Sequence, residues 1–202
     1  MRDSIDFSNV DQLPIQLQSV LTYQVLETGE HLFHQGEVAT TLFAIKTGRV
    51  RLLHYTESGQ VLNHYQVMVG EVLAEVILFL DHYACSAIAA ERTEVLVFPK
   101  PAFLAALQHS PNFATSFMAQ IAQRLHITKV MLELRGIHSA RDRVLHYLRF
   151  IIPPDQKSIV LEQPLKAIAY DLGISPESLS RALTQLENEG MIERDKRSLR
   201  LI

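Results

Sequence analysis

The chain has 202 residues, of which 48% are hydrophobic and 20% are charged, and its formal net charge is −3. This composition is typical of globular proteins and excludes the disordered and collagen-like classes. A single cysteine, Cys85, excludes an internal disulfide, a cysteine-ligated iron–sulfur cluster and a multi-cysteine zinc site. We expect a cytoplasmic protein without a membrane span, because Val72–Leu80 is too short to cross a bilayer and Met1–Val10 carries two acids instead of an apolar signal.

The charges are divided unevenly along the chain. Residues 1–136 hold 9 Lys and Arg against 13 Asp and Glu, whereas residues 137–202 hold 10 against 9. The C-terminal third can therefore present a basic face to an anionic partner such as DNA.

Between Gly29 and Pro99, short β-branched or aromatic runs alternate with turn residues, which predicts an antiparallel β-roll or barrel. The predicted strand segments are Leu42–Lys46, Arg49–Tyr55, Val61–Met68 and Glu94–Phe98, with turns at Thr47-Gly48, at residues 57–60 and at Val69–Glu71. We assign residues 1–110 to this sensor domain.

A long segment, Asn112–Arg135, contains no glycine or proline and repeats apolar residues three and four positions apart, which predicts a helix of some six turns. One face can cover the β-roll, and the other can pair with the same helix of a second chain. The dimerisation residues are expected to be Met118, Ile121, Leu125, Thr128 and Leu132. The alternative is a helix buried entirely within one chain.

Gly136 ends that helix, and a second helix is predicted over Ser139–Ile152. We therefore divide the rest of the chain into a dimerisation helix, 111–136, and a C-terminal domain, 137–202.

The segment from Pro164 to Gly190 predicts a helix, a tight turn at Gly173 and a second helix. Ser175 is a good N-cap, Pro176 suits the first helical position, and Gly190 is a C-terminal stop. The buried faces are expected to use Ile168, Ala169, Leu172, Ile174, Leu179, Ala182 and Leu183.

The first turn of such a second helix enters the major groove of DNA. An arginine can bind guanine, a glutamate can accept a hydrogen bond from cytosine, and a serine can contact a base or a phosphate. Met191–Ile202 is predicted to form two short strands around a charged turn, a wing that contacts phosphate. The expected DNA-binding residues are Lys166, Ser175, Glu177, Ser178, Ser180, Arg181, Lys196 and Arg197.

With these motifs in this order, the chain resembles the Crp/Fnr family of bacterial transcription regulators over nearly its whole length. The resemblance rests on Gly29–Glu37, Leu42–Val50 and Gly70-Glu71 for the β-roll, Asn112–Arg135 for the dimerisation helix and Pro164–Ile202 for the winged helix. It implies an α+β protein with a jelly roll like the cyclic-nucleotide-binding domain, a long helix and a winged helix-turn-helix.

The resemblance also implies a homodimer that binds a palindromic site on double-stranded DNA and contacts RNA polymerase. The residues matching Glu177, Ser180 and Arg181 read bases in the family. Pro176 stands where the cyclic AMP receptor has an arginine, so the trio is closer to the Fnr-type pattern and a half-site containing TTGA is expected.

The effector pocket departs from the family's cyclic-AMP cassette. Glu75 and Ser86 match, but Ala74 replaces a glycine, Cys85 replaces the arginine that holds the phosphate, and Lys129 replaces a serine. Ordinary cyclic nucleotide binding is therefore not expected, because a buried phosphate needs a cationic partner. The pocket residues implied by the resemblance are Gly70, Glu71, Leu73, Ala74, Glu75, Cys85, Ser86, Thr128 and Lys129, with the effector unknown and no cofactor expected.

The sequence leaves three alternatives open, for the role of Cys85, for metal binding and for the role of the winged helix. Cys85 is either a packing residue or a redox switch, whose thiol is acidified near a helix N-terminus. A small-barrel metal enzyme would need a ligand cluster, and the nearest candidate, His31, His34 and Glu37, falls on a strand where residues i and i+3 are expected to point to opposite faces. The winged helix can also serve as a scaffold that binds only proteins. We expect a regulator that is not an enzyme.

Overall fold

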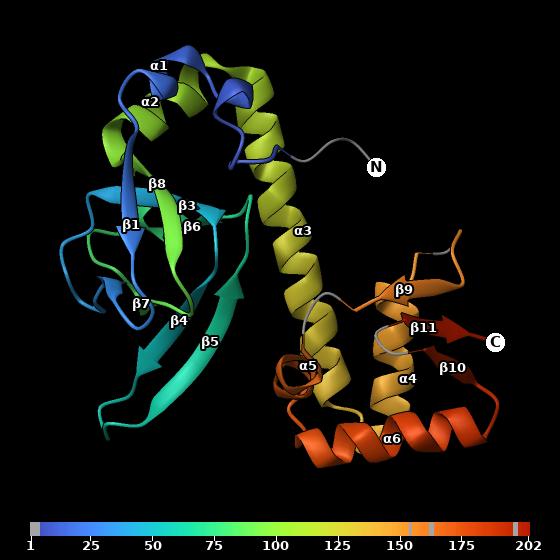
Figure 1. Ribbon diagram of the computed structural model, residues 1–202. Coiled ribbons are helices and arrows are strands. Elements are labelled where there is room, and N and C mark those ends of the chain that lie inside the picture. The colour runs from blue at the N-terminus through green and yellow to red at the C-terminus, as the bar shows by residue number, and fades with distance from the viewer. Residues whose placement is uncertain (1–4, 154, 162–163, 196–197) are drawn as a thin grey trace. The chain divides into compact units, whose positions relative to one another are not determined.

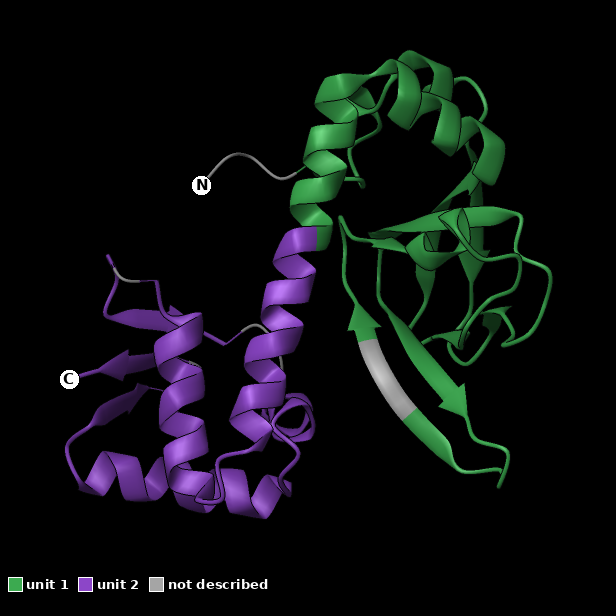
Figure 2. Cartoon of the chain, turned by 180° about the vertical axis from the view of Figure 1, so that it is seen from behind, with its two compact units in different colours: residues 1–121 green, residues 122–202 purple. Residues whose placement is uncertain are grey.

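The computed structural model describes residues 5–153, 155–161, 164–195 and 198–202, without the side chains of residues 63–65. The chain forms two compact units, residues 1–121 and residues 122–202 (Figure 2). The helix α3 (Pro111–Arg135) begins in the first unit and ends in the second. Its bounds confirm the predicted long helix.

The first unit contains two four-stranded antiparallel sheets (Figure 1), which confirms the predicted β-roll. The strand orders are β1-β8-β3-β6 and β2-β7-β4-β5. The strands are β1 (Thr22–Leu26), β2 (His31–Phe33), β3 (Thr41–Thr47), β4 (Val50–Tyr55), β5 (Val61–Val67), β6 (Val72–Leu73), β7 (Ser86–Ala89) and β8 (Thr93–Pro99).

The predicted turn at Thr47-Gly48 joins β3 to β4 and has room only for glycine. Gly48 has a φ of 80°, and a Cβ there would lie 2.5 Å from Thr93 Oγ1 and 2.6 Å from the Arg92 carbonyl oxygen. A side chain at this position would be strained and would also collide with the backbone that leads into β8.

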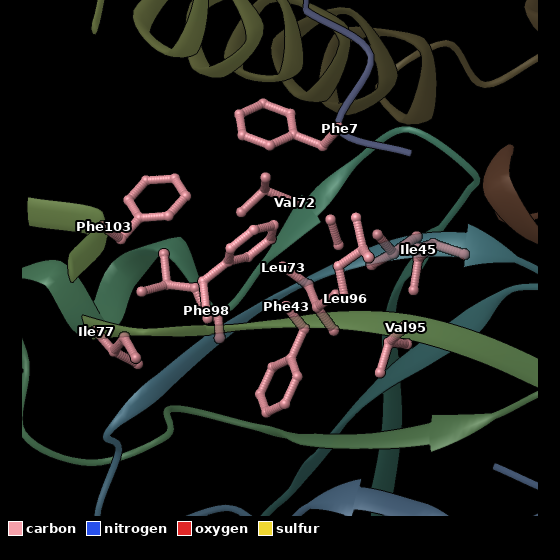
Figure 3. Packing of buried hydrophobic residues seen from close by; sticks show 14 of the residues in the cluster. Phe7, Phe43, Ile45, Val72, Leu73, Ile77, Val95, Leu96, Phe98 and Phe103 are labelled. Atoms are coloured by element: carbon pink, nitrogen blue, oxygen red, sulfur yellow. The ribbon is translucent and has the colours of Figure 1, made fainter. Parts of the chain in front are cut away.

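The core of the first unit occupies both faces of the sheet β1-β8-β3-β6, since Phe43 and Leu73 project from one face and Leu96 and Phe98 from the other. Phe43, Leu73, Leu96 and Phe98 are buried there (Figure 3). Phe7, which comes from the N-terminal segment, has its ring centroid 5.8 Å from that of Phe113 on α3. Aromatic contacts thus attach the start of α3 to the β-roll, as the sequence predicts for one face of this helix.

Short helical segments complete the first unit. None of them is predicted from the apolar spacing of the sequence. They are the 3₁₀ turns η1 (Val10–Gln12) and η2 (Glu75–Leu78) and the α-helices α1 (Ile15–Gln18) and α2 (Lys100–His109).

The second unit packs three further helices and a three-stranded antiparallel sheet of order β10-β11-β9 around its own core. The elements are α4 (Ala140–Ile151), β9 (Ser158–Val160), α5 (Leu165–Asp171), α6 (Pro176–Asn188), β10 (Ile192–Asp195) and β11 (Ser198–Leu201). All except β9 were predicted from the sequence. Among the described residues, no helix has the length and apolar character that a bilayer span requires.

Candidate nucleic-acid interface and effector site

The turn between α5 and α6 is built on Gly173. Its φ is 65°, in the left-handed region that favours glycine. The Gly173 N–H donates to the Tyr170 carbonyl at 2.9 Å, and the Ile174 N–H donates to the Ala169 carbonyl at 3.0 Å. These two bonds form a Schellman motif, which ends α5 and lets the chain reverse into α6 as predicted.

The N-terminus of α6 is capped as the sequence indicates. The Ser175 hydroxyl accepts a hydrogen bond from the Ser178 N–H at 3.1 Å, and Pro176 is the first helical residue. Hydrogen bonds from the Glu177 backbone N–H and from the Ser175 side chain lower the pKa of the Glu177 carboxyl, and Arg181 lowers it further. Glu177 is therefore a carboxylate acceptor at neutral pH.

The two faces of α6 differ sharply. One is buried in the core of the second unit and consists of Leu179, Ala182, Leu183 and Leu186. The other is exposed and carries the predicted base-reading residues Glu177, Ser180 and Arg181. Among the described residues, no hydrogen bond or ion pair holds the Arg181 guanidinium. This cation is thus available to an external acceptor.

The exposed face extends beyond the residues singled out from the sequence. A shallow open depression of about 440 Å³ is lined by Ser180, Arg181, Thr184, Gln185, Asn188 and Glu189. Thr184, Gln185 and Asn188 continue the outward stripe, since they follow Arg181 at helical spacing. That spacing was the signal in the sequence that would have identified them.

The remaining predicted DNA-binding residues lie in different environments. Lys166 is exposed on α5. Ser178 is half-buried, and its hydroxyl accepts a hydrogen bond from the Ser175 hydroxyl at 3.1 Å, so both serines serve the helix cap. Lys196 and Arg197 lie outside the described residues.

Two acidic groups at the C-terminal end of α6 are paired with arginines. Glu187 forms an ion pair with Arg194, and Glu189 forms one with Arg141. In each case the arginine hydrogen bond is the main reason that the carboxyl pKa is lowered. This pairing reduces the repulsion that the C-terminal end of α6 would exert on phosphates.

The predicted wing is present as the antiparallel pair β10 and β11. The cross-strand neighbours Glu193 and Arg200 form an ion pair at 3.2 Å. The helix-turn-helix and wing thus form one module with a polar outward face on α6, the arrangement that inserts a helix into a DNA groove.

In the β-roll, the first residues of the predicted effector cassette have structural contacts. The Gly70 carbonyl accepts hydrogen bonds from the Phe7 N–H and from Gln120 Nε2, each at 3.2 Å. Glu71 Oε2 accepts one from the Met68 N–H at 2.8 Å, and Leu73 is fully buried. These residues hold the turn before β6.

Ala74 and Glu75 begin the short turn η2. Ala74 has a φ of 65° and is the one non-glycine residue with a positive φ among those described. It therefore occupies a conformation that glycine adopts without cost, at the position where the resemblance places a glycine. Glu75, the first residue of η2, is half-buried.

Cys85 is half-buried, and burial raises the pKa of its thiol, with the nearby Glu75 carboxylate raising it further. The acidified thiol that a redox switch requires is thus not found here, because desolvation and the Glu75 carboxylate both disfavour the thiolate. The neighbouring Ser86 is buried, and its hydroxyl accepts a hydrogen bond from the Gln35 N–H at 2.9 Å.

Thr128 and Lys129 are exposed residues of α3 that belong to the second unit, whereas the cassette belongs to the first. The Thr128 hydroxyl donates to the Arg124 carbonyl at 2.8 Å, within the helix.

Three of the five predicted dimerisation residues form an exposed apolar row on α3. Met118, Leu125 and Leu132, spaced seven residues apart, are 61%, 54% and 71% exposed, while Ile121 is half-buried. This exposure favours a partner helix over the alternative of a helix buried entirely within one chain.

The expected orientation of His31 and His34 is also wrong. Their rings stack with centroids 4.2 Å apart instead of pointing to opposite faces. The cause is local, since the pairing register of β2 shifts between His31 and Phe33 and His34 follows the end of the strand. Glu37 Oε2 accepts a hydrogen bond from the His34 N–H. The described residues contain no group of three or more side chains suited to a metal ion.

Two family models match the chain. The model of the cyclic nucleotide-binding domain matches residues 23–110, and that of the Crp-like helix-turn-helix domain matches residues 142–202. Together they cover more than half of the sequence and both of the modules described above.

Individual relatives agree with the family models. The chain is 28% identical to the cyclic AMP receptor protein of Thermus thermophilus over 89% of this chain and 84% of that protein. It is 27% identical to the solved structure of DNR from Pseudomonas aeruginosa, with a TM-score of 0.51 and coverage of 94% and 87%. A CooA mutant from Carboxydothermus hydrogenoformans shares the fold, with a TM-score of 0.69, 20% identity and coverage of 90% and 83%. The chain belongs to the Crp/Fnr family of DNA-binding transcription regulators.

Proposed function

We propose that this regulator binds a palindromic DNA site as a homodimer and is controlled by an effector or state of its β-roll other than ordinary cyclic AMP. The observation that carries the proposal is the outward face of α6, where Glu177, Ser180 and Arg181 are exposed together above a buried apolar face. RNA polymerase is the expected protein partner, by analogy with the family.

Base reading is supported by the chemistry of this face. The Glu177 carboxylate can accept a hydrogen bond from cytosine N4, and Arg181 can donate to guanine O6 and N7. Ser180 lies between them and can contact a base or a phosphate. Lys166, exposed on α5, suits a phosphate contact that does not depend on sequence.

Dimerisation is supported by the exposed row on α3. A heptad spacing of large apolar side chains is typical of a helix that pairs with another helix. Pairing with an identical helix would bury Met118, Leu125 and Leu132 and create the two-fold symmetry that a palindrome requires. The proposed site residues for dimerisation remain Met118, Ile121, Leu125, Thr128 and Leu132.

The proposed control differs from that of a cyclic-AMP receptor because of the charges around Cys85. Burial raises the pKa of its thiol, which is therefore neutral at neutral pH, and the Glu75 carboxylate raises this pKa further. A phosphodiester anion placed at Cys85 would lie beside a neutral thiol instead of the arginine that the family's cassette has there, which is unfavourable at a partly desolvated position.

The experiment that tests DNA binding is selection from a pool of random duplexes with the purified full-length protein. We expect enrichment of an inverted repeat, because two identical recognition helices read two identical half-sites. A pool that stays random through successive rounds would reject the regulator mechanism and favour a protein-binding winged helix.

The effector proposal is tested by isothermal titration calorimetry with cyclic AMP and cyclic GMP. We expect no binding at micromolar concentrations. The matched variant Cys85→Arg supplies the missing cation, so its affinity for cyclic AMP should rise. Micromolar binding by the unchanged protein would contradict this part of the proposal.

A further inference from the structure

At the C-terminal end of α5, two carbonyl groups accept no backbone hydrogen bond from the described residues. The Schellman motif uses the carbonyls of Ala169 and Tyr170. The next two carbonyls, those of Asp171 and Leu172, come directly before Gly173. Helix-end carbonyls of this kind need donors from elsewhere in the structure.

Arginine side chains from two other helices supply these donors. Arg135, the last residue of α3, donates from Nε to the Asp171 carbonyl at 3.3 Å. Its side-chain carbons also lie against Gly173, with Cγ 3.7 Å from the position a Cβ would take. The end of α3 therefore contacts the turn that leads into the recognition helix.

Arg143, from α4, joins three segments. Its Nη1 donates to the Leu172 carbonyl at 2.8 Å, while its Nε and Nη2 donate to the Ile137 carbonyl at 3.0 Å and 2.5 Å. Ile137 lies two residues after the end of α3. The planar fork of the arginine holds several N–H donors in fixed directions and binds both carbonyls, whereas a lysine offers one compact ammonium on a flexible stem.

We propose that Arg135 and Arg143 are positioning residues that fix the turn before α6 to the C-terminal end of α3. This inference rests on the proposed function, because it assigns the two arginines a role in aiming the DNA-reading helix. All of the groups involved lie within the second unit. A change at the end of α3 would then reach α6 through the carbonyls of Asp171, Leu172 and Ile137.

The test compares Arg143→Lys and Arg135→Ala with Arg149→Lys, a matched control at an exposed arginine near the end of α4. We expect each positioning variant to lose about tenfold or more in affinity for the selected duplex, the effect of losing one charge-assisted hydrogen bond. Affinity for a random duplex should be unchanged, because phosphate contacts do not require an exactly aimed helix.

Hydrogen exchange separates positioning from simple destabilisation. In both positioning variants, the amides of Gly173 and Ile174 should exchange faster, while those in the middle of α4 and α6 should keep their protection. Faster exchange throughout the second unit would assign the arginines to general stability and overturn the inference. Unchanged affinity for the selected duplex would also overturn it.

The closing control is Arg181→Ala, which tests the proposed function itself. If Arg181→Ala loses its preference for the selected duplex while Arg143→Lys and Arg135→Ala keep theirs, only the positioning role is rejected. An unchanged protein without sequence preference would reject the proposed function.

Discussion

Arg181 and Glu177 give the outward face of α6 one donor fork and one acceptor four residues apart. Their opposite charges interact, since Arg181 contributes to the lowered pKa of the Glu177 carboxyl. Both side chains are exposed, so this mutual attraction is weak and can be exchanged for contacts with DNA. The charged side chains on the outward face of α6 are therefore accessible to a ligand such as DNA.

We predict that Arg181→Ala lowers affinity for the selected site by about 1–3 kcal/mol and relaxes the preference at one base position. Lys166→Ala should instead weaken binding to selected and random duplexes equally, because a phosphate contact carries no base information. Fluorescence anisotropy with both duplexes measures the two effects. Equal losses on both duplexes for Arg181→Ala would remove it from the base-reading role.

Tyr147 on α4 and Asp171, the last residue of α5, form a partly buried pair of titratable groups. Burial raises the pKa of Tyr147 to about 12, and the Asp171 carboxylate adds to this effect. Burial also raises the pKa of Asp171, while Arg135 opposes that change. Because the folded-state pKa of the phenol exceeds its ordinary value of about 10, the folded state retains this proton more strongly than the unfolded state.

It follows that stability falls as the pH rises from about 10 towards about 12, by at most about 1.4 kcal/mol per pH unit for this group. We predict that Tyr147→Phe reduces this alkaline loss and that Tyr170→Phe, on α5, does not. Urea denaturation at about pH 9 and about pH 11 gives the comparison. An identical alkaline loss in Tyr147→Phe and the unchanged protein would contradict the prediction.

At the residue level, the sequence predicted positions whose chemistry is local. The Ser175 cap, the Gly173 turn and the exposed trio on α6 follow from neighbours within a few residues. The environment of Cys85 did not, because its pKa depends on burial and on Glu75, ten residues away in the sequence. The stacking of His31 on His34 also depends on strand pairing that the sequence pattern does not specify.

At the scale of elements, α3 serves two cores and leaves a third face open. Phe113 and Phe117 are buried in the core of the first unit, and Leu134 is buried in that of the second. Met118, Leu125 and Leu132 remain exposed between these anchors. An unpaired apolar row of this length on a helix is typical of an association surface.

We predict that Leu125→Glu dissociates the proposed dimer. Each chain would lose one buried leucine side chain, worth about 1.5–3 kcal/mol, and the two new carboxylates would repel each other across the interface. The dissociation constant of the dimer should therefore rise at least about a hundredfold. Folding should be unaffected, because Leu125 is 54% exposed in the single chain. Sedimentation equilibrium tests the change, with Gln123→Glu as an exposed control outside the row.

A Leu125→Glu protein that sediments as the same species as the unchanged protein would place the association surface elsewhere.

Long helices with a regularly repeated spacing of apolar residues could be predicted from the sequence, whereas short helices and strands could not. The sequence predicted α3, α4 and α6 within one or two residues, because their apolar spacing is repeated over several turns. It gave no sign of β9, three residues long, whose place depends on pairing with β11. The helix α2 was also missed, since it begins between Pro99 and Pro101 and has one buried stripe too short to define a period.

At the scale of the whole molecule, two modules with separate cores make up one regulator. The β-roll retains the cyclic nucleotide-binding fold but has Cys85 where the resemblance places a phosphate-binding arginine. The winged helix has the chemistry of a DNA-reading module, and more of its individual residue positions could be predicted from the sequence than in the β-roll. The domain boundaries 1–110, 111–136 and 137–202 remain a prediction, since α3 belongs partly to each compact unit.

The central claim is that two copies of α6 read two half-sites about one helical turn of DNA apart. The most direct measurement is the affinity and stoichiometry of protein binding to the selected inverted repeat. The comparison is a duplex whose central spacer is about five base pairs longer, which rotates one half-site by half a helical turn. We predict two chains per duplex on the original site and an affinity close to that of random DNA on the lengthened one. Equal affinity for both spacings, or one chain bound per duplex, would contradict the account.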